Sequence, residues 1–80
     1  IIYYYSDWCN PCKMLGPRMA KLQSEGKINM RKLNVDTESE SAAKHGVRNI
    51  PTLILMENGE AVGRKVGMLS ESQILEFYNG

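Results

Sequence analysis

The chain has 80 residues, 42% hydrophobic and 24% charged, so we expect one small domain over residues 1–80. Ten basic and nine acidic residues give a net charge of +1 and are interspersed, which argues against a nucleic-acid-binding or membrane-surface protein. No apolar segment is long enough to span a membrane, and the short apolar start does not have the length of a signal-peptide core.

The first half of the chain predicts a strand, a helix and a strand. Residues 1–6 are apolar at successive positions, as in a strand covered on both faces. Residues 10–24 have a helical pattern, in which Pro17 predicts a kink and Gly26 the end. Residues 28–36 predict the second strand. A strand–helix–strand order implies a right-handed parallel crossover.

The second half opens with a short helix. Residues 37–40, Thr-Glu-Ser-Glu, predict a capping box, and Gly46 ends the helix. Residues 52–56 and 60–66 predict two antiparallel strands, because Asn58-Gly59 between them is a strong hairpin signal.

The last helix carries two start signals and reaches about Asn79. Ser70 and Gln73 form a capping box, and Leu69 packs on Ile74. The order predicts an α/β fold, with a four-stranded mixed sheet flanked by helices. Open α/β sheets place their active sites at the carboxyl ends of their strands, where the two cysteines lie.

Cys9 and Cys12, the only cysteines, follow the first predicted strand and begin the first helix. A disulfide between them closes too short a loop to stabilise the fold much, which favours a chemical role. The helix start favours a thiolate on Cys9, whereas Cys12 is expected to be buried with a higher pKa. Cys9 is therefore the predicted nucleophile and Cys12 the resolving thiol of a disulfide exchange.

A metal site and purely structural cysteines are the alternatives. A zinc or iron–sulfur site within the chain needs further Cys or His ligands, and only His45 is available. We interpret His45 as a solvated helix residue, and we expect no metal site.

Longer motifs resemble one known family. Trp-Cys-x-Pro-Cys-Lys with a later proline, Lys-Leu-Asn-Val-Asp, Gly-Val-Arg-Asn-Ile-Pro-Thr, Asn-Gly and Val-Gly follow the order and spacing of the thioredoxins over nearly the whole chain. The resemblance implies a thioredoxin-like fold. The family's first strand and helix do not appear in this sequence, so it is either a fragment or a naturally small member of about glutaredoxin size.

The resemblance also implies a substrate site around the cysteines. Pro51 matches the family's cis-proline, which packs against the cysteine pair and turns the Ile50 backbone toward an extended substrate segment. Trp8 is expected to shield the site and offer apolar surface, and Gly67 to keep the floor of the groove low.

Two positions differ from the family pattern. Tyr3 replaces a buried acid that is thought to move the proton of the resolving thiol, so Lys32 lacks its usual partner. We expect Tyr3 to hydrogen-bond Lys32 or a buried water, and we treat both residues as proton-transfer candidates. Asn10 replaces a common glycine, and it and Pro11 help to set the redox potential.

The predicted function is a monomeric, cytoplasmic protein disulfide reductase whose redox group is the Cys9–Cys12 disulfide, with no bound cofactor. Electrons would come from NADPH through a thioredoxin-reductase-like flavoenzyme, or from glutathione in a glutaredoxin-like protein. By resemblance, clients include ribonucleotide reductase and peroxidases. The alternatives are an oxidase or isomerase, marked by a potential near about −120 mV rather than about −270 mV, and a docking module using Trp8, Pro51 and Gly67.

Overall fold

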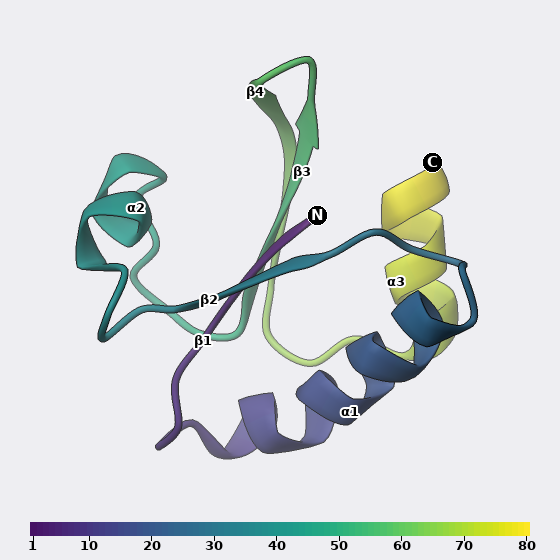
Figure 1. Ribbon diagram of the computed structural model, residues 1–80, viewed down its shortest axis with the longest axis horizontal. Helices are drawn as coiled ribbons and strands as arrows, with labels where there is room; N and C mark the ends of the chain where they lie inside the picture. The colour runs from purple at the N-terminus through teal and green to yellow at the C-terminus, as the bar shows by residue number, and fades with distance from the viewer.

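The computed structural model describes all 80 residues and confirms the predicted order of elements (Figure 1). The elements are β1 (Ile2–Tyr5), α1 (Asn10–Ser24), β2 (Arg31–Asn34), α2 (Ser39–Lys44), β3 (Thr52–Glu57), β4 (Glu60–Val66) and α3 (Glu71–Asn79). The strands form one sheet in the order β2-β1-β3-β4, and only the β1–β2 pair is parallel. The expected four-stranded mixed sheet of an α/β protein is therefore confirmed. No helix is long and apolar enough to cross a membrane.

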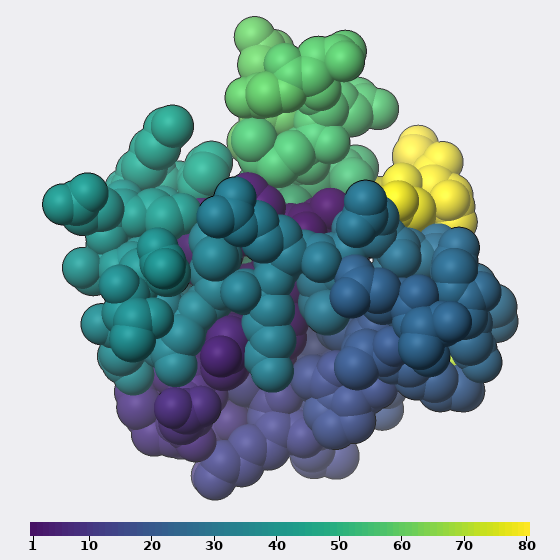
Figure 2. All heavy atoms as spheres, in the orientation of Figure 1, coloured from purple at the N-terminus to yellow at the C-terminus, as the bar shows by residue number.

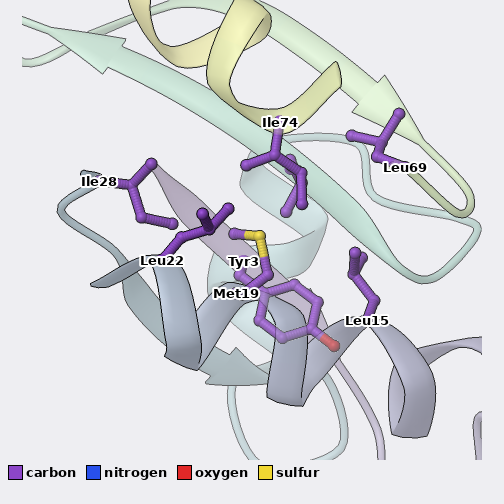
Figure 3. Close-up of a cluster of buried hydrophobic side chains, with 8 residues drawn as sticks. Tyr3, Leu15, Met19, Leu22, Ile28, Leu69 and Ile74 are labelled. Carbon is purple, nitrogen blue, oxygen red and sulfur yellow. The ribbon is translucent and has the colours of Figure 1, made fainter. Parts of the chain in front are cut away.

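The helices cover both faces of the sheet, α1 and α3 on one side and α2 on the other (Figure 1). Successive side chains of a strand point to opposite faces, so β1 supplies both layers. Tyr3 joins a cluster of eight buried residues with α1 and α3 (Figure 3), and Tyr4 joins a cluster of three with Ala42 and Ile54. The α1 face thus holds the larger core.

Helix α1 has the predicted bounds and continues through Pro17. Beyond its end, Gly26 has a φ of 74°, a backbone angle that glycine adopts without the Cβ clash of other residues. The Gly26 N–H donates to the Gln23 carbonyl at 3.0 Å, and the Lys27 N–H donates to the Leu22 carbonyl at 3.0 Å. These two bonds form a Schellman motif, which confirms the predicted terminator.

The start of α2 differs from the prediction. The capping residue is Glu38, which makes no side-chain cap, and the Thr37 hydroxyl donates to the Asn34 carbonyl at 3.3 Å. The capping box predicted over residues 37–40 is wrong, because Thr37 belongs to the turn that follows β2. Strand β2 is also shorter than predicted, since it pairs only with the four residues of β1.

The C-terminal half follows its local signals. Asn58 and Gly59 both have positive φ, 52° and 82°, as a two-residue hairpin turn requires. The tip of this hairpin projects from the body of the molecule (Figure 2). The capping box between Ser70 and Gln73 is present in both directions, and Leu69 lies in the same buried cluster as Ile74.

Candidate active site

Cys9 and Cys12 lie where β1 passes into α1. Cys9 is the N-cap of the helix, with extended backbone angles, and Cys12 belongs to the first turn. Their Cα atoms are 5.2 Å apart, and the two sulfurs form a disulfide. This Cα separation falls within the range that a disulfide spans without moving the backbone.

The helix start provides the polar environment of the pair. The Cys12 N–H donates to Cys9 Sγ at 3.2 Å, so the cysteine sulfur caps α1. Cys12 is buried as predicted, but in the disulfide form Cys9 is equally buried, and each residue is 4% exposed. The unpaired N–H groups and the positive end of a 15-residue helix both favour negative charge on the Cys9 sulfur.

Pro51 and Gly67 meet beside the strand that leads to the cysteines. The Ile50–Pro51 peptide bond is cis, as the resemblance implies. Tyr4 of β1 pairs with Thr52 of β3, which brings Pro51 to the end of β1 that leads to Cys9. The Gly67 N–H donates to the Pro51 carbonyl at 2.9 Å, which joins the two backbones. Pro51 itself is less than 2% exposed, so it lies beneath the surface of the site and Gly67 lies nearer to solvent.

Trp8 is 67% exposed, and its orientation is fixed by a residue that the sequence reasoning missed. The indole Nε1–H donates to Asp36 Oδ2 at 3.0 Å. Because β1 and β2 are parallel, their carboxyl ends meet at one edge of the sheet, and Asp36 follows β2 there. That topology was already predicted and is the signal that could have found Asp36.

Tyr3 does not hydrogen-bond Lys32, so that alternative of the prediction is wrong. The Tyr3 hydroxyl donates to the Cys12 carbonyl at 3.2 Å in a buried position. Burial raises the pKa of Tyr3 to about 12, and repulsion from Tyr5 adds to the shift. Lys32 Nζ lies instead over the Tyr5 ring, 4.4 Å from its centroid. Tyr3 and Lys32 are thus held by a hydrogen bond and a cation–π contact, respectively, and not by a contact with each other.

A cavity of about 450 Å³ lies beside Cys12 and is called here the Cys12 cavity. Its walls come from β1, the turn after it, α1 and β2, and include Tyr3, Tyr5, Asp7, Cys12, Lys13 and Lys32. Ser6 also lines it and is 2% exposed, and its hydroxyl has no hydrogen-bond partner. The cavity is open to solvent, and polar groups therefore line it together with the resolving cysteine.

The residues that could serve a metal do not gather around the cysteines. No group of three or more His, Cys, Asp and Glu residues lies close enough to share an ion. His45 is at the end of α2, where its Nδ1 is 2.9 Å from the Tyr4 hydroxyl, so the expectation of a solvated histidine is wrong. The site offers thiol chemistry, not a ligand set.

Comparisons with known proteins agree with this geometry. The thioredoxin family model matches residues 1–79. The thioredoxin of Haemophilus influenzae is 41% identical over 81 aligned residues, which cover 99% of this chain and 76% of that protein. The crystal structure of reduced Schistosoma mansoni thioredoxin pre-protein superposes with a TM-score of 0.88 at 31% identity, covering 98% of this chain and 73% of that one.

A further similar chain comes from a structure concerned with the thiol resolving mechanism in yeast mitochondrial 1-Cys peroxiredoxin via glutathione/thioredoxin systems. It has a TM-score of 0.81 and 28% identity, and the match covers 94% of this chain and 71% of that chain. The family match spans nearly every residue and includes the disulfide at the start of α1. The chain belongs to the thioredoxin family, and it is a thiol-disulfide oxidoreductase whose redox-active group is the Cys9–Cys12 disulfide.

Proposed function

We propose that the protein reduces disulfides in other proteins, with Cys9 as the attacking thiol and Cys12 as the resolving thiol. The observation that carries this assignment is the N-cap position of Cys9, whose sulfur accepts the Cys12 N–H at 3.2 Å. In the reduced protein, the same N–H and the helix dipole favour a thiolate on Cys9. Cys12 lies one turn deeper, and the Tyr3 hydroxyl holds its carbonyl.

The reaction has two exchange steps. The Cys9 thiolate attacks one sulfur of a client disulfide, which forms a mixed disulfide and releases the other client sulfur as a thiolate. Cys12 then loses its proton and attacks Cys9 Sγ. The Cys9–Cys12 bond forms, the bond from Cys9 to the client breaks, and the second client sulfur leaves. Two electrons pass to the client, and its two thiolates take protons from solvent.

The surface formed by Trp8, Ile50 and Gly67, with the buried Pro51 beneath it, is the proposed docking groove for clients. Trp8 is exposed, as are the apolar side chains Val66 and Met68 on either side of Gly67. The backbone N–H and C=O of Ile50 take part in no hydrogen bond within the chain. An extended client segment would therefore pair with Ile50 as an added strand, beside the disulfide that it delivers.

Asn10 and Pro11 are proposed to influence the redox potential, because they form the first turn of α1 between the two thiols. The side chain of Asn10 is exposed and forms no hydrogen bond in the disulfide state. A hydrogen bond from its amide to a thiolate would stabilise the reduced form, and Asn10→Gly would reveal its contribution as a changed potential.

For the source of electrons we propose a flavoenzyme of the thioredoxin-reductase type that uses NADPH, with glutathione as the alternative. The similar chain studied with glutathione/thioredoxin systems supports both donors, and it supports peroxidases as clients. Ribonucleotide reductase is proposed as a client from family resemblance alone. We further propose that the protein acts as a monomer in the cytoplasm, where a reducing environment returns the pair to the dithiol.

Insulin reduction tests the proposal. The protein is supplied either with thioredoxin reductase and NADPH or with glutathione, and precipitation of the insulin chains is followed. We expect turnover with at least one donor, its loss in Cys9→Ser, and a trapped mixed disulfide in Cys12→Ser. If insulin is reduced with neither of the two donors, the protein is not a reductase of this kind. A potential near about −120 mV would then favour an oxidase or isomerase. Retained activity in cells of the double serine variant would favour a docking module.

A further inference from the structure

The Cys12 cavity is lined by charged groups as well as by the resolving cysteine. Its ionisable walls are Asp7 from the turn after β1, Lys13 from α1, Lys32 from β2, and the phenols Tyr3 and Tyr5. Two cations and one carboxylate therefore surround it. A cavity of about 450 Å³ is roughly 10 Å across, a range over which unit charges still interact measurably near a protein surface.

Tyr3 cannot act as the base that takes the proton of Cys12. Its hydroxyl already donates to the Cys12 carbonyl at 3.2 Å, and the buried phenol keeps its proton well beyond neutral pH. A protonated phenol is a poor proton acceptor near pH 7. The position that carries an acid in the family therefore anchors the Cys12 backbone in this chain.

Lys32 is held in place by an aromatic stack. Its ammonium is 4.4 Å from the centroid of the Tyr5 ring, and that ring stacks on Tyr3 at 5.7 Å with an interplanar angle of 30°. Tyr3 is in turn fixed to Cys12. Lys32 is exposed on an edge strand, and the contact with Tyr5 favours the position of its ammonium on the wall of the Cys12 cavity over other positions in solvent.

We propose that Lys32, positioned by Tyr5, activates Cys12 electrostatically, so that the resolving step of this protein depends on a cation and not on a buried base. This inference rests on the proposed function and specifies how its second step is controlled. The Cys12 thiol releases its proton to solvent through the open side of the Cys12 cavity. The thiolate, stabilised by Lys32, attacks Cys9 Sγ and displaces the client thiolate, as in the exchange above.

The pKa of the Cys12 thiol is the first test. It is measured in the Cys9→Ser protein from the ultraviolet absorbance of the thiolate against pH. Lys32→Met and Tyr5→Leu should raise it, and Asp7→Asn should lower it, each by about 0.3 to 1 pKa unit. Lys44→Met is the matched control, because it removes one cation from α2 on the opposite face and should leave the pKa unchanged.

Single-turnover oxidation by dithiobisnitrobenzoate separates the two steps. The first thionitrobenzoate is released by Cys9 and the second by the attack of Cys12. Near pH 7 the second phase should slow about twofold to tenfold in Lys32→Met and accelerate in Asp7→Asn, relative to the first phase. Lys32→Arg should restore the wild-type ratio.

Two outcomes overturn the inference. An unchanged second phase in Lys32→Met shows that the cation does not act on Cys12. A second phase that slows in Asp7→Asn shows that this carboxylate serves as a base. Asp7 and Lys32 are tested in separate variants. If one variant misfolds, the second phase of the other still tests the inference. Absence of the first phase in the wild-type protein would instead refute Cys9 as the nucleophile, and so the proposed function itself.

Discussion

Tyr3 and Tyr4 are neighbours on one strand, both are at most 1% exposed, and they serve opposite faces of the sheet. Tyr3 lies in the eight-residue cluster under α1, and its hydroxyl forms one hydrogen bond, to the Cys12 carbonyl. Tyr4 lies in the three-residue cluster under α2. Its hydroxyl is 2.7 Å from the Ser41 hydroxyl and 2.9 Å from His45 Nδ1.

The comparison shows two ways of holding a helix on a sheet. Helix α1 buries a long apolar stripe, so its position and that of the cysteines come mainly from the hydrophobic effect. Helix α2 has six residues and buries only Ala42, so side-chain hydrogen bonds to Tyr4 contribute more of its attachment. The redox site is thus built on the face with the larger core.

Truncating one leucine on each face should show the difference between the two faces most strongly. Leu22 of α1 is 0% exposed, and Leu22→Ala should lower the free energy of unfolding by about 3 kcal/mol because it leaves a cavity. Leu33, half-buried on the α2 face, should cost about 1 kcal/mol as Leu33→Ala, because solvent fills part of the gap. Urea denaturation of the oxidised proteins measures both. Equal losses would show that the two faces contribute alike.

The sequence predicted those elements whose signals are local. The bounds of α1, the hairpin at Asn58-Gly59 and the capping box at Ser70 all depend on residues within one turn of each other, and all are confirmed. The cysteine pair belongs to this class, since its chemistry follows from the start of the helix that contains it.

Partners from distant segments were not predictable in the same way. In the predicted topology, the Tyr3 hydroxyl could have reached several hydrogen-bond partners. Only the packing of α1 on β1 determines that its partner is the Cys12 carbonyl. His45 was assigned to solvent because a short helix at the surface exposes most of its residues, yet α2 lies with its last turn over Tyr4. The pairing of the strands was predictable, but the hydrogen-bond partners of the side chains were not.

High pH should reveal the burial of Tyr3 on the α1 face next. The folded-state pKa of Tyr3 is raised to about 12, above the ordinary value of about 10. The folded protein therefore binds this proton more tightly, and the associated stability is fully present below pH 10. It is lost as the pH rises toward 12, by up to about 2 kcal/mol. The urea midpoint should fall less over this range in Tyr3→Phe than in the wild type. An equal fall in both would contradict the shift.

Removing single hydroxyls gives a smaller and more specific contrast. Tyr4→Phe should cost about 1.5 kcal/mol because two partners lose a hydrogen bond, and Tyr3→Phe about 1 kcal/mol because one does. Only Tyr3→Phe should alter the second phase of dithiobisnitrobenzoate reduction, since only Tyr3 contacts the cysteine turn. Denaturation together with that kinetic measurement tests the pair. A kinetic effect of Tyr4→Phe would show that the faces are coupled.

The smallest effects should come from the partners of Tyr4. In Ser41→Ala the Tyr4 hydroxyl keeps His45, and in His45→Ala it keeps Ser41, so neither leaves a buried donor without an acceptor. Each should cost about 0.5 kcal/mol in urea denaturation. The double variant should cost more than the two together, because only then does the hydroxyl lose both side-chain partners and keep only the Ser41 carbonyl, at 3.4 Å. Strictly additive losses would show that the three groups act independently, and that packing around Ala42, not the hydrogen-bonded cluster, holds α2 on the sheet.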